Sequence, residues 1–170
     1  MSRGFVKEDD QEEAPLIPPR ASLPPGVTNY VTPRGLEALL EEKVKLEEEK
    51  AANKKENEAE RRYENMMIEG KLKLLVERIN SARVVEPSPE AGEEVRFGST
   101  VTLKTIKGRK PGLVRRFTIV GVDEADVKAG KIAFIAPIAQ AVTGSRKGDL
   151  VKFHLGGAVE ELEVAEVSIG

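Results

Sequence analysis

The chain has 170 residues, of which 39% are hydrophobic and 33% charged, and its formal net charge is -2. It contains no cysteine, which excludes disulfides and thiolate zinc sites, and its single histidine argues against a histidine-based metal centre. The small net charge argues against nucleic acid as the main partner. No apolar run is long enough to span a membrane, and the N-terminal MSRGFVKEDD lacks the apolar core of a signal peptide, so we expect a cytoplasmic protein without a membrane partner.

Residues 1–30 are predicted to form a flexible, acidic and proline-rich tail. Five of the ten prolines and an acidic cluster from Glu8 to Glu13 lie in this stretch. Such a composition buries too little apolar surface to offset the entropy of ordering, so we expect an extended chain around the prolines. Phe5 and Val6 are the only hint of a docking peptide. A solubilising tail and a partner-binding motif both remain open.

Residues 31–85 are predicted to form a helical coiled-coil hairpin. Its first arm opens with Thr32-Pro33, a hydroxyl N-cap followed by proline at the first helical position. One face of this arm is apolar at helical spacing, through Leu36, Leu39, Leu40, Val44 and Leu46.

The second arm has two apolar stripes. One has the spacing of a coiled-coil seam and comprises Ile68, Leu72, Leu75, Ile79 and Ala82. The other lies beside it and comprises Tyr63, Met67, Gly70 and Leu74. Two stripes predict two neighbours, the first arm and another domain.

Between the arms, residues 47–62 have no large apolar side chain, but they are rich in helix formers and in opposite charges at helical spacing. The predicted reversal lies near Asn53 or Asn57, because each is followed three residues later by a glutamate, Glu56 or Glu60. We therefore expect a hairpin that is packed at its base and solvated at its tip.

Residues 86–94 are predicted to be a linker, since Glu86-Pro87-Ser88-Pro89 ends the helical pattern. From residue 95 to residue 170 the apolar period becomes that of strands. Residues 131–135 are predicted to be a central strand, and Pro137 is predicted to open a short helix that ends before Gly144.

The last two predicted strands are joined by a turn at Gly156-Gly157, and a change of phase predicts a bulge near Ala165-Glu166. His154 is predicted to face solvent from the first of them. The expected fold class is α+β, a helical hairpin followed by a small antiparallel sheet of five or six strands with one short helix.

Several ordered stretches resemble the bacterial transcript cleavage factors GreA and GreB. In the C-terminal region they are FGSTVT from Phe97, IVGVDEAD from Ile119 and APIAQA from Ala136, followed by Gly148-Asp149 and Gly156-Gly157. In the hairpin, Thr32-Pro33-Arg34-Gly35, Ile68-Glu69-Gly70-Lys71 and the stretch from Asn80 to Val84 also resemble this family. The resemblance covers roughly residues 29–169.

This resemblance implies an FKBP-like C-terminal domain that docks at the rim of the RNA polymerase secondary channel. It also implies that the hairpin tip is directed to the active centre, in indirect contact with the nascent RNA and DNA. The expected protein is then a monomeric transcription elongation factor, not an enzyme, and it has no cofactor of its own because the Mg²⁺ is held by the polymerase. The polymerase-binding residues implied are Asp123, Glu124, Ala136, Pro137 and Ile138. The alternatives are a plain surface loop for the two acids and a purely structural helix start for the other three.

The hairpin tip departs from the family pattern. The family places an Asp and a Glu there to help hold Mg²⁺, a hard ion that prefers anionic oxygens. Here the aspartate position is Asn53, Glu56 fits the glutamate position, and the arms are shorter by about two helical turns each, roughly 10 Å of reach. Glu58 and Glu60 are candidates to replace the missing acid. A merely solvated helix start is the alternative role for these glutamates.

Four functions remain open at this point. The first is a cleavage-stimulating elongation factor, and the second is a non-cleaving regulator or inhibitor in the same channel, which the missing aspartate and short arms favour. The third, an FKBP-like prolyl isomerase, requires an aromatic pocket, whereas Phe97, Phe117, Phe134 and Phe153 are expected to be core. The fourth is a coiled-coil adaptor, which the polar tip disfavours.

Overall fold

The computed structural model describes residues 13–169, so Phe5, Val6 and the acidic residues from Glu8 to Glu12 lie outside the described part. The chain divides into two compact units. Of the described residues, one unit comprises residues 13–20 and Leu39–Asn80, and the other comprises Ala21–Ala38 and residues 81–169. The second unit therefore includes the first turns of the first long helix.

The two arms of the hairpin are α2 (Pro33–Ala52) and α3 (Glu58–Ser81), which confirms the predicted helix start and the predicted position of the reversal. At the start of α2, the Oγ1 atom of Thr32 accepts a hydrogen bond of 2.9 Å from the backbone N–H of Gly35. This bond satisfies one of the four N–H groups that the first turn of a helix leaves free.

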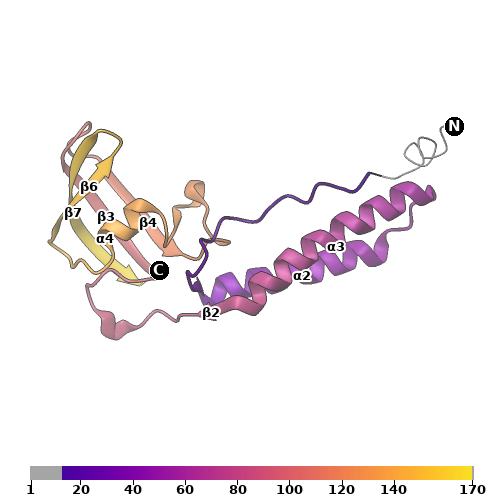
Figure 1. Ribbon diagram of the computed structural model, residues 1–170. Helices are drawn as coiled ribbons and strands as arrows, with labels where there is room; N and C mark the ends of the chain where they lie inside the picture. The colour runs from indigo at the N-terminus through magenta and orange to yellow at the C-terminus, as the bar shows by residue number, and fades with distance from the viewer. Residues whose placement is uncertain (1–12, 170) are drawn as a thin grey trace. The chain divides into compact units, whose positions relative to one another are not determined.

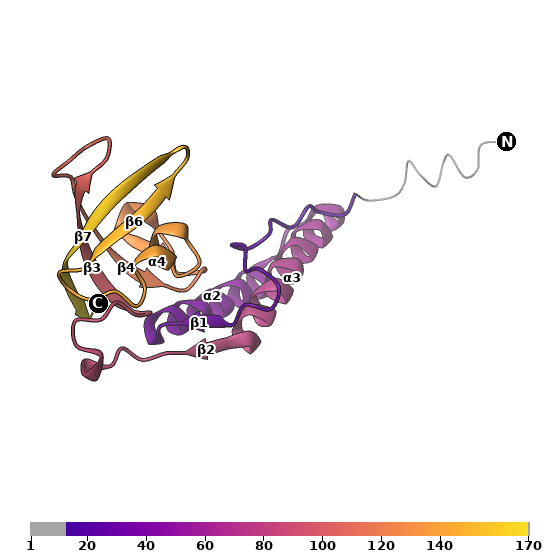
Figure 2. The same ribbon diagram turned by 60° about the vertical axis from the view of Figure 1, so that its left-hand side comes forward.

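The prediction that Ala82 continues the seam of the second arm is wrong. Ala82 begins β2 (Ala82–Val84), which pairs in parallel with β1 (Asn29–Val31), as Figure 2 shows. The ladder continues with a 2.9 Å bond from the Val85 N–H to the Val31 carbonyl. The backbone leaves the helix here because β1 offers hydrogen-bond partners to residues 82–85. Three-residue strands give little sequence signal, so the pair was not predicted.

Apolar side chains of both arms are withdrawn from solvent. Leu39 of α2 and Ile68 and Leu75 of α3 are buried, while Leu72 and Ile79 are half-buried. An ion pair of 2.9 Å between Lys50 and Glu69 also joins the two arms. The seam prediction is thus confirmed from Ile68 to Ile79.

The C-terminal sheet has five strands in the order β5-β4-β3-β7-β6. Their bounds are Ser99–Lys107 for β3, Val114–Val120 for β4, Lys131–Ala133 for β5, Leu150–Leu155 for β6 and Ala158–Ile169 for β7. Short 3-10 turns precede β3 and β5, at Pro89–Ala91 and Val127–Ala129. The α+β fold class is confirmed, and Figure 1 shows the sheet beside the short helix α4 (Pro137–Val142).

Two details of the sheet differ from the predictions. β5 ends at Ala133 and forms an edge of the sheet, so a longer central strand was the wrong expectation. It also pairs in parallel with β4, whereas the other pairs of this sheet are antiparallel. The strand stops because the chain turns, with a hydrogen bond from the Ala136 N–H to the Ala133 carbonyl, and then enters α4.

The other local predictions for the sheet are confirmed. Thr102 lies opposite Glu166 and Leu103 lies opposite Val164, so Ala165 is the extra residue of a bulge. β6 and β7 are joined at Gly156-Gly157, where Gly156 has a φ of +63° that favours glycine. His154 is exposed.

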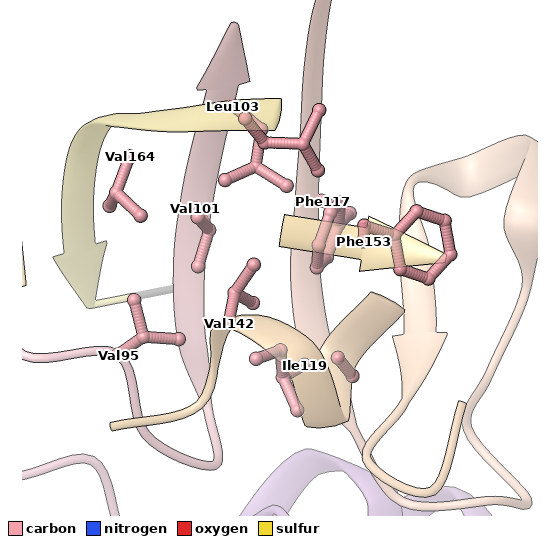
Figure 3. Packing of buried hydrophobic residues seen from close by; sticks show 10 residues of the cluster. Val95, Val101, Leu103, Phe117, Ile119, Val142, Phe153 and Val164 are labelled. Atoms are coloured by element: carbon pink, nitrogen blue, oxygen red, sulfur yellow. The ribbon is translucent and has the colours of Figure 1, made fainter. Parts of the chain in front are cut away.

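One cluster of buried side chains forms the core of this unit (Figure 3). The strands and α4 contribute to it, together with Val95 from the preceding loop, and its buried members are Val95, Val101, Leu103, Phe117, Ile119, Ala139, Val142, Phe153, Leu162 and Val164. In the described residues, no helix is both long and apolar enough to cross a lipid bilayer.

Candidate functional site at the hairpin tip

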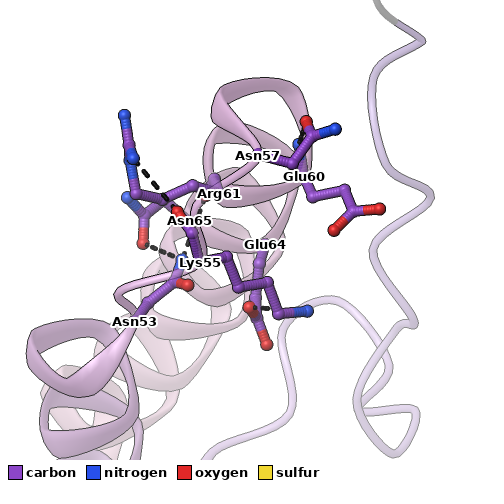
Figure 4. Close-up of polar contacts among 7 residues, drawn as sticks. All are labelled: Asn53, Lys55, Asn57, Glu60, Arg61, Glu64 and Asn65. Carbon is purple, nitrogen blue, oxygen red and sulfur yellow. Dashed lines mark hydrogen bonds and ion pairs between the residues drawn. The ribbon is translucent and has the colours of Figure 1, made fainter.

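Asn53 points into the loop between the arms. Its Nδ2 atom donates to the Arg61 carbonyl at 3.0 Å and to Asn65 Oδ1 at 2.9 Å (Figure 4). Its own Oδ1 atom is buried and has no hydrogen-bond partner among residues 13–169. The Asn53 side chain therefore ties the loop to α3 and does not present its oxygen to solvent.

The start of α3 is capped by Asn57. Its Oδ1 atom accepts a hydrogen bond of 3.1 Å from the backbone N–H of Glu60, which confirms the capping prediction at this asparagine. On the other side of the loop, Arg61 Nη1 donates to the Lys55 carbonyl at 3.1 Å. These contacts fix the loop without a buried apolar side chain, as the composition of the tip requires.

The glutamates of the tip fall into two groups. The Glu58 carboxylate lies 3.7 Å from Arg61 Nη2 and 3.7 Å from Arg62 Nη1, and Glu64 pairs with Lys55 at 3.1 Å. Glu56 and Glu60 are exposed, and no ion pair engages their carboxylates within residues 13–169. Of the four loop glutamates, Glu56 and Glu60 are thus the two whose carboxylates are not engaged by a described cation.

The tip is electrically balanced. Between residues 53 and 64, the cations Lys54, Lys55, Arg61 and Arg62 match the carboxylates Glu56, Glu58, Glu60 and Glu64 in number. No group of three or more acidic or histidine side chains that could hold a metal ion occurs within the described part of the chain. The side chains of Glu56 and Glu60 are exposed, whereas the Oδ1 atom of Asn53 is buried.

Sequence reasoning missed Asn65 and Arg61 as partners of the loop. Their contacts depend on how the chain crosses from α2 to α3, and neither residue belongs to a motif. The capping pattern at Asn57 was visible because it is local: donor and acceptor are three residues apart.

A second set of predicted residues lies in the C-terminal unit. Pro137 is exposed and occupies the first turn of α4, Ala136 is its N-cap, and Ile138 packs against the core. Asp123 is half-buried. Pro137 is therefore accessible to a partner, while Ile138 attaches the same turn to the core of the unit.

Glu124 is engaged within its own unit. Its Oε1 atom accepts a hydrogen bond of 2.5 Å from Thr32 Oγ1, its Oε2 atom lies 3.7 Å from Lys131 Nζ, and its side chain is 11% exposed. A Cβ on Gly35 would lie 2.7 Å from this carboxylate, so glycine permits the approach. Glu124 thus joins the start of α2 to the loop after β4.

Three aromatic side chains of this unit contact one another. Tyr30 of β1 lies with Phe97 and Phe134 in a trio whose ring centroids are 5.6–6.0 Å apart. Such spacing is typical of tilted and edge-to-face pairs. Phe117 and Phe153 are buried in the core, as expected for them.

Comparison with known proteins identifies the family. Residues 89–169 match the model of the transcription elongation factor GreA/GreB C-terminal family. The GreA of Acidiphilium cryptum is 36% identical over 109 residues, which cover 64% of this chain and 68% of the relative. The chain belongs to the GreA/GreB family.

Other proteins are similar over different spans. The GreA of Phenylobacterium zucineum is 37% identical over 100 residues, covering 59% of this chain and 62% of its own length, which is less than two thirds. The GreA factor homolog 1 of Thermus thermophilus aligns over 84% of this chain and 99% of its own, with 20% identity and a TM-score of 0.39.

Proposed function

We propose that this GreA/GreB family member is a transcription elongation factor that binds bacterial RNA polymerase at the secondary channel. The C-terminal domain docks at the channel rim, and the hairpin tip is directed to the active centre. The observation that supports this function is a helical hairpin, held by a few buried side chains, with a loop of charged residues in a chain that shares the family's C-terminal domain. The protein modulates the polymerase's own activity and is not itself an enzyme.

The hairpin loop favours a non-cleaving member of the class as a second candidate. Asn53 uses its amide to hold the loop, Glu58 is paired with two arginines, and the net charge of residues 53–64 is zero. Recruitment of a magnesium ion requires local negative charge. Only Glu56 and Glu60 offer it here, so we expect weak or absent stimulation of cleavage.

Transcript cleavage by a stalled, backtracked elongation complex separates the two candidates. The wild-type chain is compared with Glu56→Ala, Glu60→Ala and Glu58→Ala, of which the last removes a carboxylate already paired with arginine. If the chain stimulates cleavage, the first two changes are expected to lower its rate at least about tenfold, a loss of roughly 1.4 kcal/mol of transition-state stabilisation. Unchanged or slowed cleavage despite binding supports the non-cleaving candidate.

Binding to the polymerase core enzyme tests the docking part of the proposal. Pro137→Asp introduces a charge at the exposed first turn of α4 and is expected to weaken binding about tenfold, roughly 1.4 kcal/mol. Pro111→Asp, in the exposed loop between β3 and β4, is the matched control and is expected to bind as the wild type does. Failure of the wild-type chain to bind polymerase would overturn the proposed function.

A further inference from the structure

The segment of residues 13–20 runs in extended form along the hairpin, as Figures 1 and 2 both show. From residue 15 to residue 18 the exposure of its side chains alternates. Pro15 and Ile17 are half-buried, whereas Leu16 between them is 88% exposed. The alternation indicates that one edge of this segment is in contact with the helices.

Ile17 packs against Gly70 in the middle of α3. A Cβ placed on Gly70 would lie 2.4 Å from Ile17 Cδ1 and 2.5 Å from Cγ1, distances at which atoms overlap. Glycine inside a helix is less favourable than alanine by about 1 kcal/mol. The absence of a side chain at Gly70 of α3 leaves room for Ile17.

The segment reaches the other arm through Arg20. Its Nη1 atom donates to Glu42 Oε2 of α2 at 2.8 Å, and the arginine side chain is only 19% exposed. Within four residues the segment thus contacts both α3 and α2. A contact to both arms adds to the few apolar side chains that hold them together.

The beginning of the segment lies at the tip of the hairpin. Glu13 lines an open groove of about 560 Å³ together with residues from the loop and the first turns of α3, which are Lys55, Ala59, Glu60, Tyr63, Glu64 and Met67. Glu13 to Ile17 is four residues of extended chain, about 13 Å, and the turns of α3 between Tyr63 and Gly70 span about 10 Å. The segment is therefore long enough for Glu13 to reach the groove while Ile17 contacts Gly70.

We infer that residues 13–20 are a strap that clamps the two arms of the hairpin, with Ile17 on α3, Arg20 on α2 and Glu13 at the tip. The inference does not depend on the proposed binding to RNA polymerase.

Disulfide trapping in the full chain tests the strap, because the chain has no cysteine of its own. The Ile17→Cys/Gly70→Cys variant removes the isoleucine atoms that would overlap a side chain at position 70. Under oxidised glutathione, which accepts the two electrons and two protons, its thiols are expected to form an intramolecular disulfide. The matched control, Leu16→Cys/Gly70→Cys, starts from a neighbouring side chain that faces solvent and is expected to react at least tenfold more slowly. Equal rates would overturn the inference.

Discussion

The hairpin and the C-terminal sheet are stabilised by different kinds of contact. The sheet has a cluster of ten buried side chains contributed by its strands, by α4 and by a loop. In the described part of the hairpin, the buried large apolar side chains are Leu39, Ile68 and Leu75, and the remaining contacts are ion pairs, amide hydrogen bonds and the strap.

This difference shows which part of the chain is free to adapt to a partner. A buried strand residue must fit its neighbours, because interiors are close-packed. The residues of the hairpin loop make few packing contacts, so their charges can change at little cost in stability. The balanced loop and its inward-facing Asn53 belong to this loosely packed part of the chain.

Removal of a large side chain from the sheet core is expected to have the largest effect. Leu103 is fully buried in β3, the middle strand, and Leu103→Ala should lower the free energy of unfolding by about 2–5 kcal/mol. Urea unfolding followed by the amide resonances of β3 and β7 measures this loss. The control is Val114→Ala, at a side chain that is 58% exposed, and a comparable loss there would contradict the difference in packing.

A leucine-to-alanine change in the hairpin tests whether its packing tolerates a cavity better than the packing of the sheet does. Leu75 is fully buried in α3, yet Leu75→Ala is expected to cost about 2–3 kcal/mol, the lower part of the range for such changes, because two helices can close around a cavity more easily than a sheet can. Thermal unfolding monitored by helical circular dichroism measures it. Tyr63→Ala, at a side chain that is 46% exposed, serves as the control. A cost for Leu75→Ala above that of Leu103→Ala would refute the explanation from packing.

Local patterns made much of this fold predictable. The start of α2 follows from Thr32-Pro33, the bulge at Ala165 from a change of phase, and the turn at Gly156-Gly157 from two glycines between alternating runs. The β1–β2 pair and the edge position of β5 were not predictable, because they depend on which distant strand supplies the hydrogen bonds.

In the candidate site, too, local contacts could be predicted from the sequence and contacts between distant residues could not. The cap at Asn57 depends on residues three apart, and the sequence indicates it directly. The inward orientation of Asn53 depends on Asn65, twelve residues away across the loop, and the strap depends on Ile17 reaching Gly70. A glycine inside a helical stripe was visible in the sequence, but nothing there indicated what fills the space.

The smallest expected effect concerns the ion pair of the loop between Lys55 and Glu64. Their side chains are 51% and 40% exposed and the charged atoms are 3.1 Å apart, so water and salt screen the attraction. A double-mutant cycle with Lys55→Ala and Glu64→Ala is expected to give a coupling of about 0.2–1 kcal/mol in thermal unfolding, and less in high salt. A larger coupling that persists in high salt would mean that the loop excludes water. The loop would then resemble the interior of the sheet, and its charges would be fixed by stability and not left free for a partner.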